Sequence, residues 1–240
     1  KRDRLFVHDV DGNITEHPVY RCIYFEIVNG DKTKIIFDGR WYEVDGTFIS
    51  RIVKTLDLIQ ISTLTFPAVE VWDEGGKSKI ESEGDYNTRA ATAHGYFLLD
   101  KKLVKTDRTT SPIELCDLLT PAKQLVHVKH RKGGSAGLSH LFAQGGVAAE
   151  IMLGDKAFRK KTRMVLRGVS PTASDLVPLD TFKSTDYEIV FLILGEGSAT
   201  LKQNLPFFSK VNLSKAYENL TQRGFRVSIA GAPTTPRLTP

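Results

Sequence analysis

The chain has 240 residues, of which 41% are hydrophobic and 25% are charged, as in an ordinary globular protein. This composition excludes a disordered chain, a collagen-like fibre and a coiled coil, and no run of about 18 apolar residues exists that could form a transmembrane helix. Only two cysteines are present, Cys22 and Cys116, which excludes a disulfide scaffold and a four-cysteine zinc site. A reduced, cytoplasmic setting and no membrane partner are therefore expected.

The net charge of +5 is modest, but the basic residues are unevenly distributed. Residues 123–132 and 156–167 together contain ten of the 33 Lys and Arg residues and no Asp or Glu. Two such clusters in consecutive elements favour binding of a polyanion over a merely solvated face. The residues expected to contact a nucleic acid are Lys123, Arg131, Lys132, Lys156, Arg159, Lys160, Lys161 and Arg163.

The first 80 residues predict a small β-rich region. Its expected strands lie at residues 5–10, 20–28, 34–37 and 40–44. The first two are separated by an Asp-Gly-Asn turn, and the last two are joined by a two-residue Asp-Gly turn. A helix is expected from Thr47, where apolar residues recur at helical spacing. Residues 73–79 are polar and rich in glycine, which is typical of a mobile loop.

Residues 81–240 predict an α/β domain. The expected elements are a partly helical segment at 81–95, strands at 96–100, 113–119 and 124–130, helices from Ser135 and over 156–166, a strand at 187–194, a helix at 213–223 and a strand at 225–230. Short turns imply antiparallel pairing and helical crossovers imply parallel pairing. The fold class is therefore α/β, a mixed sheet with helices on both faces.

Two of these strands carry polar residues that could perform chemistry. The segment Ile113-Glu114-Leu115-Cys116-Asp117 supplies carboxylates, and Leu125-Val126-His127-Val128-Lys129 supplies a lysine. This order of elements resembles the restriction-endonuclease-like core, which carries a PD-(D/E)xK motif. In that fold an acid on the second strand and an acid-x-Lys on the third hold Mg²⁺ beside the scissile phosphate.

The resemblance implies a role for each candidate catalytic residue. Asp117 and Glu83, or Glu114 in place of Glu83, would hold Mg²⁺ or Mn²⁺, which prefer oxygen ligands. Lys129 would orient the attacking water or the phosphate. The chain departs from the motif at His127, which suits Mg²⁺ poorly and would act as a ligand or general base. Alternation along the strand places His127 and Lys129 on the same face.

Further polar residues lie on the helix that follows this strand. Gly133-Gly134-Ser135 precedes the helix and could bind a phosphate through backbone N–H groups, although no Gly-Lys-Ser/Thr follows as in a P-loop. Gln144 could contact a base or a phosphate, whereas His140 is more typical of a core or interface histidine. Trp41 and Tyr42 could stack on bases, but burial in a core or in a seam between domains is favoured over this role.

Six segments in order resemble a sporadically distributed, uncharacterised family of bacterial proteins carried on plasmids, prophages and mobile islands. The segments are residues 38–45, 83–87, 113–119, 127–129, 138–145 and 205–213. The resemblance covers most of the chain, and because family members are longer, this chain is expected to be a C-terminal portion of one. It implies an association with mobile elements or host defence and no established activity.

These observations favour a metal-dependent nuclease of bacterial defence or mobile elements, which hydrolyses phosphodiester bonds in DNA or RNA. Two alternatives remain open. One is a nucleic-acid-binding module without catalysis, and the other is a protein-interaction domain with an apolar patch at Phe207-Phe208. A homo-oligomer is also left open.

Overall fold

The computed structural model describes residues 2–30 and 32–237 and divides into two compact units, residues 1–54 and 55–240. Helix α2 (Gly46–Leu58) contains the point of division. Residues 55–80, which the sequence analysis assigned to the N-terminal β-rich region, belong to the second unit in this division.

The first unit is built from small antiparallel sheets. Its elements before α2 are β1 (Arg4–His8), β2 (Ile14–Pro18), α1 (Val19–Cys22), β3 (Phe25–Asn29), β4 (Lys32–Phe37) and β5 (Arg40–Glu43). β1 pairs with β2, and β3, β4 and β5 form a three-stranded sheet. Asp38 and Gly39 have φ of +47° and +71°, as the tight Asp-Gly turn requires. The strand expected at 20–28 is shorter, because α1 occupies its first part.

The aromatic residues of this unit are exposed. Trp41 and Tyr42 are 52% and 44% exposed, so they are not buried in a core of this unit, and burial in a seam between domains stays a prediction. Trp41 contacts Phe25 edge-to-face across the sheet, with ring centroids 6.5 Å apart. The rings pack on one another because a three-stranded sheet offers too little surface to cover them.

The second unit contains a six-stranded mixed sheet, which confirms the predicted α/β class. In spatial order its strands are β6 (Gln60–Ile61), β15 (Arg226–Ala232), β14 (Glu188–Leu194), β13 (Gln124–His130), β12 (Leu118–Leu119) and β9 (Phe97–Leu98). The first four run parallel to one another, whereas β12 and β9 pair antiparallel. β14 is apolar at every position after its first residue because helices cover both faces of the sheet.

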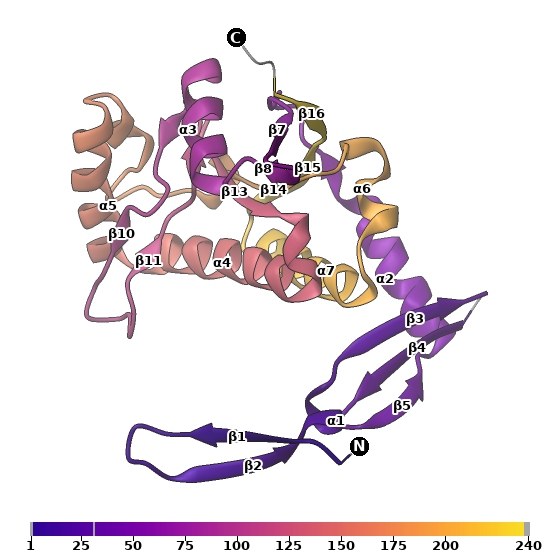
Figure 1. The fold of residues 1–240 in the computed structure, drawn as a ribbon. Coiled ribbons are helices and arrows are strands. Elements are labelled where there is room, and N and C mark those ends of the chain that lie inside the picture. The colour runs from indigo at the N-terminus through magenta and orange to yellow at the C-terminus, as the bar shows by residue number, and fades with distance from the viewer. Residues whose placement is uncertain (1, 31, 238–240) are drawn as a thin grey trace. The chain divides into compact units, whose positions relative to one another are not determined.

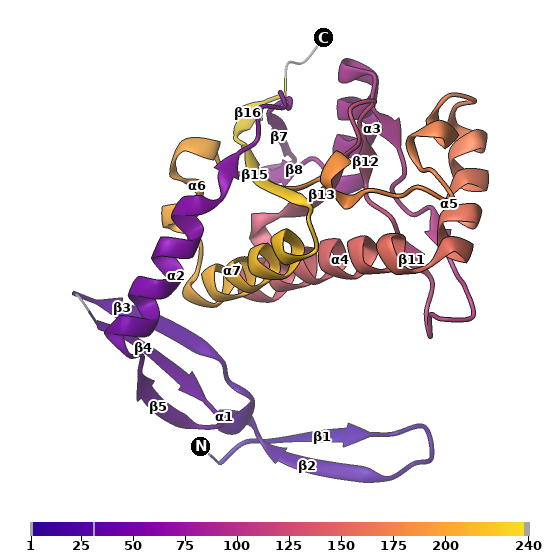
Figure 2. The same cartoon turned by 180° about the vertical axis from the view of Figure 1, so that it is seen from behind.

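Helices cover this sheet on both faces (Figures 1 and 2). On one face α3 (Glu83–His94) packs Tyr86, Ala90 and Ala91 against Val126 and Val128 of β13. On the other face α4 (Gly134–Gly154) runs beside α7 (Phe207–Gln222). The remaining helices are α5 (Lys156–Val169), α6 (Ser198–Asn204) and the 3₁₀ turns Arg131–Gly133, Ala173–Leu176 and Ser184–Asp186.

The smaller strands correct two expectations. β7 (Val69–Glu74) and β8 (Lys77–Ile80) form a hairpin, joined to β16 (Thr234–Pro236), where a mobile loop was expected over 73–79. Gly75 and Gly76 take φ of +62° and +75°, so the glycines form a tight turn instead of a loop. The strand expected over 113–119 is broken into β11 (Ile113–Glu114), which pairs with β10 (Leu103–Val104), and β12.

Among the described residues, no helix combines the length and the apolar character needed to span a membrane.

Candidate functional site

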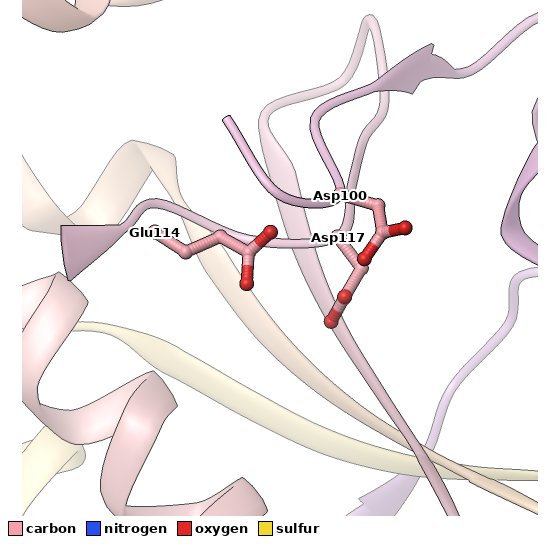
Figure 3. Close-up of side chains that lie close together, drawn as sticks. All are labelled: Asp100, Glu114 and Asp117. Atoms are coloured by element: carbon pink, nitrogen blue, oxygen red, sulfur yellow. The ribbon is translucent and has the colours of Figure 1, made fainter. Parts of the chain in front are cut away.

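Three carboxylates meet at the break between β11 and β12. Asp100, Glu114 and Asp117 each place an oxygen so that all three atoms lie within 4.8 Å of one another, and the side chains converge in Figure 3. The backbone N–H groups of Leu99 and Asp100 both donate to the carbonyl of Asp117, at 2.8 and 3.0 Å. These bonds hold Asp100 beside Asp117.

A strained turn fixes the third carboxylate. Lys101 has a φ of +61°, and its backbone N–H donates to Glu114 Oε1. Glu114 is also held by the pairing of Leu103 with its backbone in the β10–β11 hairpin. The three carboxylates are therefore placed by backbone hydrogen bonds, which is the rigid support that a metal site needs.

Burial and neighbouring charges raise the pKa values of two of these carboxyl groups. For Asp117, burial first and then the charges of Glu114 and Asp100, opposed by the Val128 N–H, together raise the pKa to about 8. That N–H donates to Asp117 Oδ2 at 2.7 Å. Burial likewise raises the pKa of Glu114. A cation would relieve this repulsion, and an all-oxygen donor set suits a hard divalent ion. Asp100, Glu114 and Asp117 could thus hold a divalent ion.

The first two turns of α3 form one wall of the site. Asn87 is fully buried, and its Nδ2 lies 3.4 Å from Asp117 Oδ1, whereas its Oδ1 has no hydrogen-bond partner among the described residues. A Cβ at Gly84 would lie 3.4 Å from Asp100 Oδ2, so the helix backbone approaches the carboxylates closely. An orphaned buried oxygen beside three carboxylates fits a site for a cation.

A lysine lies beside this cluster. Lys129 Nζ is 2.8 Å from Glu83 Oε2, and the backbone N–H of His130 donates to Glu83 Oε1 at 2.9 Å. Glu83 also contributes to the raised pKa of Asp117, so the two groups are close. The structure therefore brings together Glu83, Glu114, Asp117 and Lys129. It adds Asp100 as a carboxylate and uses Glu83 to hold Lys129, where the sequence analysis expected Glu83 to bind metal.

His127 lies apart from these residues. Its side chain is 3% exposed, its ring lies 6.2 Å from that of Phe191, and a Cβ at Gly145 of α4 would lie 3.3 Å from its Cδ2. It does not belong to the described carboxylate cluster. Burial lowers the pKa of His127 to about 4, so the ring is neutral near pH 7. These contacts place His127 in the packing under α4, and its role as ligand or general base stays a prediction.

We expect His127→Leu to keep the site's chemistry and to reduce acid sensitivity. Between pH 6.5 and about 4, His127 is protonated in the unfolded chain but stays neutral in the folded protein. The parent therefore loses stability as the pH falls through this window. Leucine has no proton to bind. Thermal melts at about pH 7 and 5 should show a smaller drop in Tm for this variant. The exposed His8→Leu is the matched control, and equal drops in both variants would contradict the packing role.

Four of the eight predicted basic residues form ion pairs. Lys123 lies 3.1 Å from Asp186, Lys156 pairs with Asp180, Arg131 with Glu196 and Arg163 with Asp175. The acidic partners all come from residues 175–196. The two basic stretches contain no Asp or Glu themselves, but the fold brings acidic residues from elsewhere in the chain next to them. These ion pairs leave fewer free cations than the sequence suggested.

Two arginines are used inside the fold. Arg159 is 7% exposed and donates to the carbonyls of Met152 and Leu179. Arg163 donates to the carbonyls of Ser174 and Val177. Contrary to expectation, neither guanidinium is available to a phosphate, because backbone oxygens already occupy its donors.

The remaining candidates are exposed or half-buried. Lys132 and Lys160 are exposed and have no ion-pair partner in the described parts of the chain, and Lys161 Nζ donates to the Lys105 carbonyl at 2.7 Å. Ser135 lies in the first turn of α4, where its carbonyl accepts from Ser139 Oγ. Gln144 lines a cavity that also includes Glu114.

Asp100 is the residue that the sequence analysis did not select. It ends the predicted strand Tyr96–Asp100, and a carboxylate at a strand end next to other acidic strands is a usable signal. Asn87 carried no such signal, because an amide within a polar helix is ordinary.

Comparisons with known proteins give a family but no activity. Residues 1–233 match a family described as "Family of unknown function (DUF6119)". The kinesin-like protein KIP2 of Eremothecium gossypii is 31% identical over 112 residues, which cover 44% of this chain and 16% of that protein. The chain is thus similar to a minor part of that protein's length. No solved structure matches.

Proposed function

The chain belongs to the DUF6119 family, whose function is unknown, and from its site we propose that it is a metal-dependent nuclease that cuts DNA or RNA. The observation that carries the proposal is the convergence of Asp100, Glu114 and Asp117 beside the Glu83–Lys129 pair. Carboxylates with a neighbouring lysine are what hydrolysis of a phosphodiester needs.

The order of elements supports the same interpretation. Helix α3, strands β9, β12 and β13, helix α4 and strand β14 occur in this order along the chain, with antiparallel pairing first and parallel pairing last. The β10–β11 hairpin lies between β9 and β12, and α5 lies between α4 and β14. This order is similar to that of the restriction-endonuclease-like core. Asp117 precedes β12 and Lys129 lies near the end of β13, which are the positions that the resemblance implies. Glu114 and Asp100 supply the carboxylates that His127 does not.

Each residue of the site has a different role in the proposed reaction. Asp100, Glu114 and Asp117 would hold Mg²⁺ or Mn²⁺, which when bound supplies charge neutralisation and activates water. Lys129 would hold the phosphate or orient the attacking water through its ammonium group. Glu83 accepts hydrogen bonds from both Lys129 and the His130 N–H, so it fixes where the lysine points. Asn87 orients Asp117 through its amide.

The test is cleavage of DNA and RNA with Mg²⁺, Mn²⁺ or chelator. The parent should cut only with a metal. Lys129→Ala and Asp117→Ala should each lose about a hundredfold or more in rate, because a group that acts on the transition state is removed. Lys183→Ala, an exposed lysine away from these side chains, is the control and should cut like the parent. If the Lys129 and Asp117 variants also cut like the parent, the site assignment is wrong.

A binding module without catalysis is the second candidate, because His127 stands where the motif has an acid. It predicts salt-sensitive affinity for nucleic acid and no cleavage with either metal. The protein-interaction alternative required an exposed patch at Phe207-Phe208, but Phe207 is only 9% exposed and packs edge-to-face on Phe208. In either catalytic or binding form, we propose a setting in bacterial defence or mobile elements, supported by the resemblance given above.

A further inference from the structure

A cavity of about 300 Å³ lies next to the carboxylates, between the β10–β11 hairpin and α4. Glu114 belongs both to its lining and to the carboxylate cluster, so the cavity adjoins the cluster. The cavity is therefore within reach of any group attached to a phosphate at the cluster. Its volume is at the lower end of that of small-molecule sites, which suits one planar ring and excludes a duplex.

The walls of the cavity are apolar and partly uncovered. Leu103 and Val147 are 57% and 45% exposed, and Pro112 and Ile113 complete the lining on the hairpin side. Aliphatic side chains that face an open cavity are available to cover a flat ring. Apolar contact of this kind covers both faces of a planar ring without reading its sequence.

Two polar side chains stand at the cavity on α4. His140 and Gln144 are four residues apart, so they lie on the same side of the helix. Neither has a hydrogen-bond partner among the described residues. A glutamine amide can pair with the edge of adenine through two hydrogen bonds, and a histidine ring offers a further donor or acceptor.

The charges of the residues that line the cavity decide which chemical group it can hold. No described lysine or arginine lines the cavity, so a phosphate or another anion inside it would have no cationic partner. A neutral ring with hydrogen-bonding edges needs none. We propose that this cavity takes one unpaired nucleobase next to the scissile phosphate, and that the substrate is a single strand or a locally unwound one.

This inference rests on the proposed nuclease function and specifies its substrate. A base inside a duplex cannot enter the cavity without leaving its stack, and this unstacking costs free energy that a single strand does not require. Single strands of DNA or RNA should consequently be cut about tenfold faster than duplexes of the same sequence.

The variants act on the cavity and not on the carboxylates. Val147→Trp should fill the cavity, and Gln144→Ala should remove contacts to the base edge while leaving the fold intact. Gln144→Ala should reduce the discrimination between adenine and other bases by about tenfold. Both variants should cut a strand with an abasic position at the site as the parent does. Met164→Trp, which changes an exposed residue of α5 outside the cavity, is the control for a surface tryptophan.

A binding measurement separates this inference from the nuclease proposal. A fluorescent adenine analogue in a short single strand, with Ca²⁺ present, should brighten when it leaves its stack and enters the cavity of the parent or of Met164→Trp. Val147→Trp should bind the same strand about tenfold more weakly. Equal cutting of duplex and single strand by the parent and both cavity variants would overturn the base site while the nuclease stands. Base-dependent brightening without cleavage in any metal would overturn the nuclease and leave the base site. Neither brightening nor cleavage would overturn both.

Discussion

Replacing Asp117 with asparagine is expected to stabilise the protein and to abolish its response to divalent ions. The parent places a buried carboxyl beside Glu114 and Asp100, which raises its pKa to about 8 from 3.8. Asparagine keeps an oxygen that can accept the hydrogen bond from Val128 and removes the charge. The stabilising effect and the loss of function therefore come from the same substitution, as is expected where a site holds charges for its ligand.

The sign follows from the two pKa values. Between about pH 4 and 8 the folded Asp117 binds a proton that the unfolded chain has lost, so the parent loses stability as the pH rises through this window. The variant has no such loss, and its advantage should grow with pH. Each pKa unit corresponds to about 1.4 kcal/mol at most, and ~1 kcal/mol moves Tm by about 2–4 °C in a chain of this size. In chelator the difference in Tm between variant and parent should reach several degrees at about pH 8 and be much smaller at about pH 5.

A second arm of the same experiment adds Mg²⁺ or Mn²⁺. An ion at about a hundred times its dissociation constant stabilises the folded parent by about 2.7 kcal/mol, or roughly 5–10 °C. Asp117→Asn should show little of this shift. The control is Asp107→Asn, an exposed aspartate in the described loop after β10 that has no ion pair. The metal site would be contradicted if neither ion changes the Tm of the parent. It would also be contradicted if Asp117→Asn is less stable than the parent at about pH 8.

Asp117, Lys129 and Glu83 were predictable from the sequence because they depend on strand order and on local pattern. Each lies at the end of an element that its own residues specify, so the order of elements places them together. The α/β class followed from the same local signals. The Gly75-Gly76 hairpin was missed because a glycine pair is as typical of a loop as of a tight turn.

Asp100 and the partners of the basic residues depend on contacts between distant segments. Asp100 joins the site only because the strand over 113–119 breaks and Asp117 offers its carbonyl to Leu99 and Asp100. The acids that pair with Lys123 and Arg131 lie more than 60 positions later in the chain. Periodicity describes a single element and contains no information on such pairs.

His127 shows a different limit. Alternation assigned it to the face that it shares with Lys129, but both faces of β13 are covered, and the pattern of a doubly covered strand cannot say what lies opposite each residue. Its neighbours in the structure are Phe191 of the next strand and Gly145 of α4. The glycine pair at 145–146 lies within continuous α4.

Two adjacent glycines of α4 should respond in opposite ways to the same substitution. A Cβ at Gly145 would lie 2.6 Å from Phe191 Cε1 and 3.3 Å from His127 Cδ2, whereas a Cβ at Gly146 meets no atom within 4 Å. Phe191 cannot move away cheaply, because its buried ring also packs edge-to-face on Phe142 at 5.1 Å. Overpacking costs ~1–3 kcal/mol, against a gain of ~0.5–1 kcal/mol for alanine over glycine within a helix.

Gly145→Ala should therefore lower the free energy of unfolding by about 1–2 kcal/mol, and Gly146→Ala should raise it by up to ~1 kcal/mol. Urea unfolding of both variants measures the difference within one helix, so helix propensity cancels. The double variant Gly145→Ala/Phe191→Leu replaces the ring with a smaller side chain. It should recover part of the lost free energy of unfolding, since the two sites are in contact and their effects are not additive. If Gly145→Ala stabilises the protein as Gly146→Ala does, then α4 does not pack closely on Phe191 and His127, and the packing position of His127 would be wrong.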